Sequence, residues 1–432
     1  MRRARTLAVA LLAGGCGSTG AADGDHVTLQ LANWATYLEA RLEDRVLAPY
    51  LRAHPELRVI QQNSSIYGDQ YRERILTSLA VGGGAAPDLF LLDNIDVPAL
   101  VNRGRVLDLA PYVDRAGVDL GCFDQTVLSI FSRGDAVYAL PRGYTPMVVA
   151  YNKDLFDRAG IPYPTDDWTW DDFLRIATLL TQDTDGDGAV DQWGTFFDRR
   201  VFLWIPWIWA GGGDVLCPGG RRATGCLDSP ATIEAIRWYT SWVTQHHIVP
   251  RAGTLRKSLG DNPRLFATGR VGMMTAGHFW IPELRPYLAG GRLRVGFVAV
   301  PHRAGFPPAT VIYASGYAVP ATGARRRLAI ELATYLTDSL AEARRGEAGL
   351  ELPAVTAAAR GLAARDTLGW DAAFLRAAAH GRAPWGARVE RWREVEAALP
   401  DLMDRITLAG AEPRVAARAM AREIDHVLGS TR

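Results

Sequence analysis

A short apolar segment between turn signals constrains the fold of this chain more than any other feature. Residues 88–92 read DLFLL, and residues 82–84, just before them, are three glycines. A strand that is apolar on both faces suits a parallel sheet that is covered by helices on each side. The glycine run is a strong stop signal for a helix that we expect over residues 70–80.

Helix and strand patterns alternate on both sides of this segment. Residues 27–32 and 57–61 have strand patterns, whereas residues 38–51 form an amphipathic helical stretch. This alternation predicts the α/β class. The length of 432 residues suggests two or three domains on size alone. Because no internal repeat or long linker interrupts the pattern, we expect lobes that share the chain by crossing over more than once.

The N-terminus carries a compartment signal. Three arginines within the first five residues precede an apolar run at residues 7–12, and small residues at 13–15 precede Cys16. This order is typical of an export signal over residues 1–15, and the run is too short to span a bilayer. A cysteine after small residues resembles a bacterial lipobox, although Ala13 stands where Leu is usual. We expect lipidation of Cys16 and a tether over residues 16–24; the alternative is an ordinary cleaved signal peptide.

Charge and cysteine content narrow the environment further. The net charge of +1 is too small to attract nucleic acid or an anionic surface electrostatically. Cys217 and Cys226 flank a short loop rich in Gly, Pro and Arg, and in an exported protein this spacing predicts a disulfide. A bridge across so short a loop orders the loop locally. Cys122 is expected to be a partly buried small side chain.

Several motifs, taken in order, resemble the extracellular solute-binding proteins of ABC importers, family 1, the maltose-binding-like group. Each is a weak pattern, but their order covers nearly the whole chain. In the last of them, two residues replace the single proline that is usual between Gly277 and Trp280. The motifs are GAAPDL at 84–89, YALP at 138–141, YNKDLFDRAG at 151–160, TWDDF at 169–173, FATGRVGMM at 266–274 and GHFW at 277–280.

The resemblance implies a periplasmic-binding-protein-like class II fold. It has two α/β lobes, a hinge of several strands and a ligand cleft between the lobes. The chain would cross over near Pro141 and Pro301. Lobe one would comprise residues 25–140 and 301–338, and lobe two residues 141–300 and 339–432.

The resemblance also implies a function. The chain would capture an extracellular mono- or oligosaccharide in the cleft and deliver it to an ABC permease. It would be an exported monomer, lipid-anchored at the cell envelope, with no required cofactor and no nucleic-acid partner.

Aromatic and carboxylate side chains fit a sugar ligand. Aromatic rings cover the C–H face of a sugar, while carboxylates and amides bind its hydroxyls. The chain has 13 Trp, and several candidates fall at strand ends, where an open α/β sheet binds its ligand. For each candidate the alternative is ordinary packing. The candidates at strand ends and crossovers are Trp34, Asp93, Asn94, Tyr144, Trp280 and Tyr313.

Three more tryptophans are candidates for different reasons. Trp204 and Trp207 would share a helical face and line the cleft, or else belong to the core of lobe two beneath the disulfide loop. Trp385 is preferred to Trp392 because Pro384 and Gly386 make it a loop residue.

An acidic loop resembles an EF-hand calcium loop. Asp183, Asp185, Asp187 and Asp191 stand at its first, third, fifth and ninth positions, and Gly188 at the sixth, where a sharp turn is required. The twelfth position holds a glycine in place of the bidentate Glu. The loop predicts a structural calcium site, and the alternative is a solvated acidic turn.

Other functions compete with sugar capture. A secreted glycosidase would also be rich in Trp and carboxylates, but the chain has no nucleophile elbow, HExxH motif or phosphate loop. A binder of glycerol-phosphate or polyamine is the main alternative, and a receptor scaffold that signals through a sensor is another. Arg142 and Arg199 are within reach of the expected cleft, so an anionic sugar is also a candidate ligand.

Overall fold

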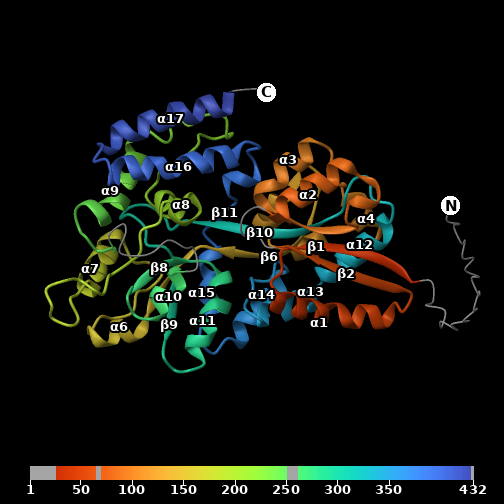
Figure 1. Cartoon of the computed structure of the whole chain (residues 1–432), viewed down its shortest axis with the longest axis horizontal. Coiled ribbons are helices and arrows are strands. Elements are labelled where there is room, and N and C mark those ends of the chain that lie inside the picture. Colours follow the sequence, from red (N-terminus) through yellow and green to blue (C-terminus); the bar gives the residue numbers. More distant parts are fainter. Residues whose placement is uncertain (1–25, 65–69, 251–260, 430–432) are drawn as a thin grey trace, which may run out of the picture.

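The computed structural model describes residues 26–64, 70–250 and 261–429 of the chain. Two lobes lie side by side, and the strands β6 and β10 run through the middle between them (Figure 1). The predicted export signal, the tether and Cys16 lie outside the described residues.

The first lobe begins with three parallel strands. β1 (Val27–Asn33) pairs with β2 (Leu57–Asn63) on one side and with β3 (Leu89–Asp93) on the other. In β3 every residue except the terminal Asp93 is buried. The continuous apolar segment is therefore a strand covered on both faces, as its sequence predicts.

Two long antiparallel strands extend this sheet toward the second lobe. β10 (Thr310–Ala318) pairs with β3, with Ser315 opposite Asp93. β6 (Leu140–Pro146) pairs antiparallel with β10, and β11 (Gly381–Arg382) pairs with its start. β10 therefore carries the chain from the second lobe back to the parallel strands of the first.

Helices surround the first sheet and share one hydrophobic core with it. The principal helices are α1 (Tyr37–Ala53), α2 (Gln70–Val81), α3 (Val97–Asn102), α4 (Ala110–Arg115), α5 (Gln125–Ile130), α12 (Arg326–Leu336), α13 (Ser339–Glu347) and α14 (Thr356–Arg365). The next helix, α15 (Trp370–Ala378), also packs against Phe297 of the second lobe. The short elements are η1 (Gly83–Ala85), η2 (Asn94–Asp96), η3 (Leu120–Cys122), β4 (Ser132–Arg133) and β5 (Ala136–Val137).

The second lobe has a smaller, antiparallel sheet. β7 (Val148–Asn152) lies between β8 (Met273–Ala276) and β9 (Val295–Val298). The helices of this lobe are α6 (Lys153–Arg158), α7 (Trp170–Leu180), α8 (Val201–Ala210), α9 (Pro230–Thr244), α10 (Asp261–Ala267), α11 (Ile281–Leu288), α16 (Trp392–Thr407) and α17 (Pro413–Gly429), and its short turns are η4 (His278–Trp280) and η5 (Trp385–Ala387).

Stacked indoles fill the core of the second lobe. The rings of Trp170 and Trp238 are stacked with their centroids 4.2 Å apart. Trp207 meets Trp242 edge to face at 4.9 Å. These side chains come from α7, α8 and α9, so the aromatic cluster fastens three helices to one another.

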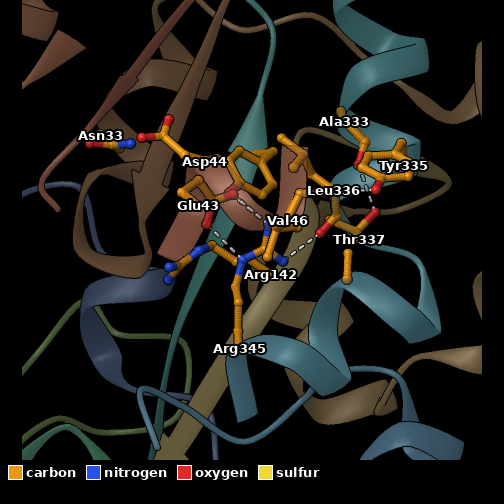
Figure 2. A network of polar contacts seen from close by, with 12 residues as sticks. Asn33, Glu43, Asp44, Val46, Arg142, Ala333, Tyr335, Leu336, Thr337 and Arg345 are labelled. Atoms are coloured by element: carbon orange, nitrogen blue, oxygen red, sulfur yellow. Dashed lines mark hydrogen bonds and ion pairs between the residues drawn. The ribbon is translucent and has the colours of Figure 1, made fainter. Parts of the chain in front are cut away.

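A buried ion pair lies inside the first lobe, between α1, α13 and β10 (Figure 2). Arg345 of α13 donates to both carboxylate oxygens of Glu43 of α1, at 2.9 and 2.6 Å, and to the carbonyl of Leu336 at 2.6 Å. The Tyr317 hydroxyl of β10 donates to Glu43 at 2.7 Å. Burial alone would raise the pKa of Glu43, but the Arg345 guanidinium outweighs it and holds this pKa at about 2.

This network ties α13 to the first lobe, since it joins α13 to α1 and β10. The family resemblance implies that residues 339–432 belong to the second lobe. The structure thus shows that the start of this range, α13, is bonded to lobe one.

The predicted disulfide between Cys217 and Cys226 is confirmed. Its loop is held against α17, because the carboxylate of Asp425 accepts the Ala223 backbone N–H at 2.5 Å. Cys122 is half-buried and unpaired. Among the described residues, no helix is both long and apolar enough to cross a membrane.

Candidate functional site

Aromatic and charged side chains gather where the parallel strands end. Trp34 follows β1 and Asp93 ends β3, so both lie at the carboxyl edge of the sheet. The Trp34 ring meets Tyr71 of α2 edge to face at 5.2 Å. A cavity of about 50 Å³ lies among these residues, with Arg72 of α2 and Arg393 of α16 in its lining. We call this cluster the strand-end site; it consists of Trp34, Arg72, Asp93, Asp96 and Arg393.

The Asp93 carboxylate is held in place by the turn that follows β3. It accepts hydrogen bonds from the Ile95 backbone N–H at 3.0 Å and from the Asn94 side chain at 2.9 Å. Burial, and then the neighbouring carboxylate of Asp96, raise the pKa of Asp93 to about 6, although Arg393 opposes the shift. Asp93 therefore changes charge close to neutral pH.

An ion bridge joins the two lobes at this site. Asp96 of η2 accepts from Arg72 at 2.7 Å and from two nitrogens of Arg393, each at 3.1 Å. Arg72 belongs to lobe one, while Arg393 belongs to α16 in lobe two. A second bridge runs nearby from Arg103 of lobe one to Glu390, at 3.0 Å. The segment around η5 and the start of α16 is thus held by polar groups of lobe one.

Tyr313 extends the site along β10 to the second lobe. Its hydroxyl donates to the carbonyl of Phe202 in α8 at 3.2 Å, and the two rings meet edge to face. Burial, followed by the carboxylates of Glu396 and Asp93, raises the pKa of Tyr313 well above its usual value. The contact with Phe202 joins β10 to α8 of the second lobe.

The structure thus brings together four of the residues that the sequence singled out. Trp34, Asp93 and Asn94 lie at the ends of β1 and β3, and Tyr313 lies within β10, two residues before Ser315, which pairs with Asp93. Tyr144 and Trp280 are buried in the core, with exposed fractions of 2% and 6%. That these last two contact a ligand stays a prediction.

The two tryptophans of α8 are packed inside lobe two. Trp204 is 0% exposed and Trp207 is 1% exposed. The Trp204 indole donates to the Arg199 carbonyl and the Trp207 indole to the Thr275 hydroxyl, both at 2.9 Å. Core packing accounts for both rings in this structure, and a ligand contact by either stays a prediction.

Trp385 lies elsewhere. Its indole donates to Asp214 at 2.7 Å, and it lines a separate, open cleft of about 1010 Å³ that contains neither Trp34 nor Asp93. The predicted ligand residues that line an opening therefore divide between two places.

The charged half of the strand-end site was missed by the sequence analysis. Asp96 and Arg393 meet although 297 positions separate them. An isolated arginine in a helical pattern usually lies on a solvent-exposed face. The local sequence therefore does not indicate that Arg72 or Arg393 belongs to a site. Phe202 was not singled out as a candidate, because it precedes the more prominent tryptophans at 204, 207 and 209.

Three of the four predicted calcium ligands converge. Carboxylate oxygens of Asp183, Asp185 and Asp187 lie within 4.8 Å of one another, and all three residues are exposed. The fourth, Asp191, accepts a hydrogen bond from the Thr184 hydroxyl at 2.6 Å. Carboxylate oxygens are suitable ligands for a hard cation such as calcium. The hydrogen bond from Thr184 holds Asp191 within the same loop. Calcium binding stays a prediction.

Calcium should raise the thermal unfolding midpoint if this loop binds it. At a hundredfold excess over the dissociation constant, the gain in free energy of unfolding is about 2.7 kcal/mol. The midpoint is measured in calcium and in a chelator, for the native chain and for Asp185→Asn. Asp114→Asn, on the exposed face of α4, is the control. Identical midpoints with and without calcium contradict the prediction.

The family of the chain follows from comparison with known sequences. The profile described as bacterial extracellular solute-binding protein matches residues 32–341. The chain belongs to this family, as its motifs predicted. A putative binding protein of Brucella abortus is 26% identical over 234 residues, which is 54% of this chain and 53% of that protein. The chain spans about half the length of the curated relatives it matches.

Solved structures confirm the predicted two-lobed, periplasmic-binding-protein-like fold. An ABC substrate-binding protein of Listeria monocytogenes, solved with cycloalternan, is similar with a TM-score of 0.81 and 21% identity, over 94% of this chain and 100% of that one. A Mycobacterium tuberculosis protein solved with glycerophosphocholine is similar with a TM-score of 0.77 and 20% identity, over 93% of this chain and 98% of that one.

Proposed function

We propose that this protein captures a carbohydrate at the strand-end site and delivers it to an ABC permease. The observation that carries the proposal is the position of the Trp34 ring and the Asp93 carboxylate at one sheet edge, facing Arg393 of the other lobe. An indole covers the C–H face of a sugar, and carboxylates and guanidinium groups bind its hydroxyls. The Listeria neighbour bound to cycloalternan supports this ligand class.

Closure of the lobes follows from the same geometry. A ligand drives closure only through greater affinity for the closed form. Here the ion bridge of Asp96 with Arg393 already crosses the site. A sugar that contacts Asp93 and Arg393 together would strengthen the link between the lobes and present one closed shape to the permease.

Replacing Trp34 should weaken sugar binding without unfolding the protein. Loss of the indole platform is expected to reduce affinity by about 10–100-fold, which corresponds to about 1.4–2.8 kcal/mol. A thermal-shift screen of mono- and oligosaccharides identifies the ligand, and calorimetry compares the native chain with Trp34→Ala. Tyr163→Ala, on the surface of lobe two, is the control. Unchanged affinity in Trp34→Ala would overturn the assignment of the site.

A phosphorylated glycerol ligand is the second candidate. Arg72 and Arg393 bring two guanidinium groups to the site, and a guanidinium group binds phosphate through bidentate hydrogen bonds. The Mycobacterium tuberculosis neighbour bound to glycerophosphocholine supports this class. Stabilisation by glycerol-phosphate compounds but by no sugar in the same screen would establish it.

We also propose that Cys16 carries a lipid that tethers the lobes to the envelope. The support is the export signal before it and the family's extracellular location. Incorporation of labelled palmitate into the native chain, and its loss in Cys16→Ala, tests the anchor; equal labelling of the two excludes it.

A further inference from the structure

The second cleft is wide and is lined by both lobes. It has a volume of about 1010 Å³, at the upper end of the range for small-molecule sites. No residue that lines it also lines the strand-end site. From lobe one, α5 contributes Gln125, Thr126 and Ser129. From the other side come the end of α8, the disulfide loop, residues 307–309 and residues 380–388.

Two indoles in this cleft are fixed by one carboxylate. Trp209 and Trp385 donate their ring N–H groups to the same oxygen of Asp214, at 2.8 and 2.7 Å. Asp214 is itself anchored, because its backbone N–H donates to the Thr232 hydroxyl of α9 at 2.9 Å. Both rings are therefore positioned before any ligand arrives, which lowers the entropic cost of binding.

The backbone beside Asp214 is packed tightly against α9. A Cβ at Gly213 would lie 2.7 Å from the Cα of Thr232, so a larger residue would push Asp214 away from its anchor. The disulfide loop closes the other side: a Cβ at Gly220 would lie 3.4 Å from the Trp385 ring. The glycines and the disulfide loop together maintain the position of the two rings.

Positive charge dominates the lining. The guanidinium of Arg382 lies 4.2 Å from the centre of the Trp209 ring, and Arg388 also lines the cleft. Asp214 is the one acidic side chain among the described lining residues, and one of its oxygens already accepts both indole N–H groups. Guanidinium groups bind carboxylate and phosphate through paired hydrogen bonds.

We propose that this cleft is a second solute site, which binds a sugar carrying a carboxylate or phosphate group. The Trp385 indole would meet the C–H face of the sugar, Arg382 and Arg388 the anionic group, and the polar side chains of α5 the hydroxyls. Since both lobes line the cleft, its occupancy changes with their relative position. The site shares no residue with the proposed capture site and does not depend on it.

Calorimetry on the full chain tests the proposal with three probes: glucuronate, glucose 6-phosphate and glucose. One or both anions should bind in the millimolar range or tighter, glucose should not bind in this cleft, and the two anions distinguish carboxylate from phosphate. Arg382→Gln should weaken anion binding by at least about tenfold, from loss of a charge-assisted contact. Arg292→Gln is the matched control, because Arg292 also lies over an aromatic ring, that of Tyr287, but outside the cleft.

Two further variants separate this site from the capture site. Gln125→Ala, on the lobe-one wall, should also weaken the anion and gives a second reading if Arg382→Gln fails to fold. Asp93→Asn should leave anion binding at this cleft unchanged. Anion binding that is lost in Asp93→Asn but kept in Arg382→Gln overturns the proposal, because the anion then occupies the strand-end site. The proposal is also overturned if neither anion binds. It is overturned as well if glucose binds as tightly as the anions and Arg382→Gln weakens glucose binding.

Discussion

Arg345→Met should lower the free energy of unfolding by about 3–5 kcal/mol, because it leaves the Glu43 carboxylate buried without its partner. Their side chains are 2% and 4% exposed, so water does not replace the lost contact. Chemical denaturation followed by circular dichroism measures the change. Arg365→Met removes an exposed pair with Glu347 and should cost less than about 1 kcal/mol. Similar losses in the two variants would show that the buried pair has no special weight.

The same ion pair gives a signed pH dependence. The pKa of Glu43 is lowered on folding from 4.5 to about 2, so its stabilising contribution is complete above 4.5 and is lost as the pH falls toward 2. Between these values the native chain should lose more stability than Glu43→Gln. Replacing both partners together by Leu and Met should recover part of the stability that either single change removes.

Sugar affinity should fall as the pH is lowered through 6. The pKa of Asp93 is raised to about 6 in the free protein, and a ligand hydroxyl that donates to this carboxylate favours its ionised form. Below this pKa, binding must release one proton, so affinity drops by up to about tenfold per pH unit; above it, affinity is constant. Calorimetry between pH 5 and about 8 measures the profile.

Asp93→Asn should abolish this profile. The amide does not titrate, and the nearby arginines keep their charge throughout the range. Asp135→Asn, on the exposed β4–β5 turn, should retain the native profile. A native affinity that is flat across pH 6 would show that the ligand does not take up the Asp93 carboxylate, even if Trp34→Ala weakens binding.

Local patterns were sufficient for the parts of the fold that local interactions determine. The apolar run of β3, the stop signal before it and the spacing of Cys217 and Cys226 each specify their structure through neighbouring residues. The end of β3 also determines where Asp93 lies, because parallel strands bring their carboxyl ends to one edge.

Tertiary contacts between distant segments had no such signal. The bridge from Asp96 to Arg393 and the pair of Glu43 with Arg345 each join residues on helices far apart in the chain. The tryptophans, in contrast, are conspicuous in the sequence, but the sequence does not show which of them are buried. Trp204 and Trp385 have the same side chain, and only their surroundings decide that one is enclosed in a core and the other lines a cleft.

The stack of indoles in lobe two determines what the protein's own fluorescence reports. Trp170 and Trp238 lie 4.2 Å apart, and Trp207 and Trp242 adjoin them, so absorbed light is shared within one packed group. Among the residues that the structure describes, Trp34 is the one indole that directly follows a parallel strand of lobe one. Denaturation followed by tryptophan emission therefore records mainly the melting of the second lobe. A change that appears on adding sugar and disappears in Trp34→Ala isolates the optical signal of the capture site.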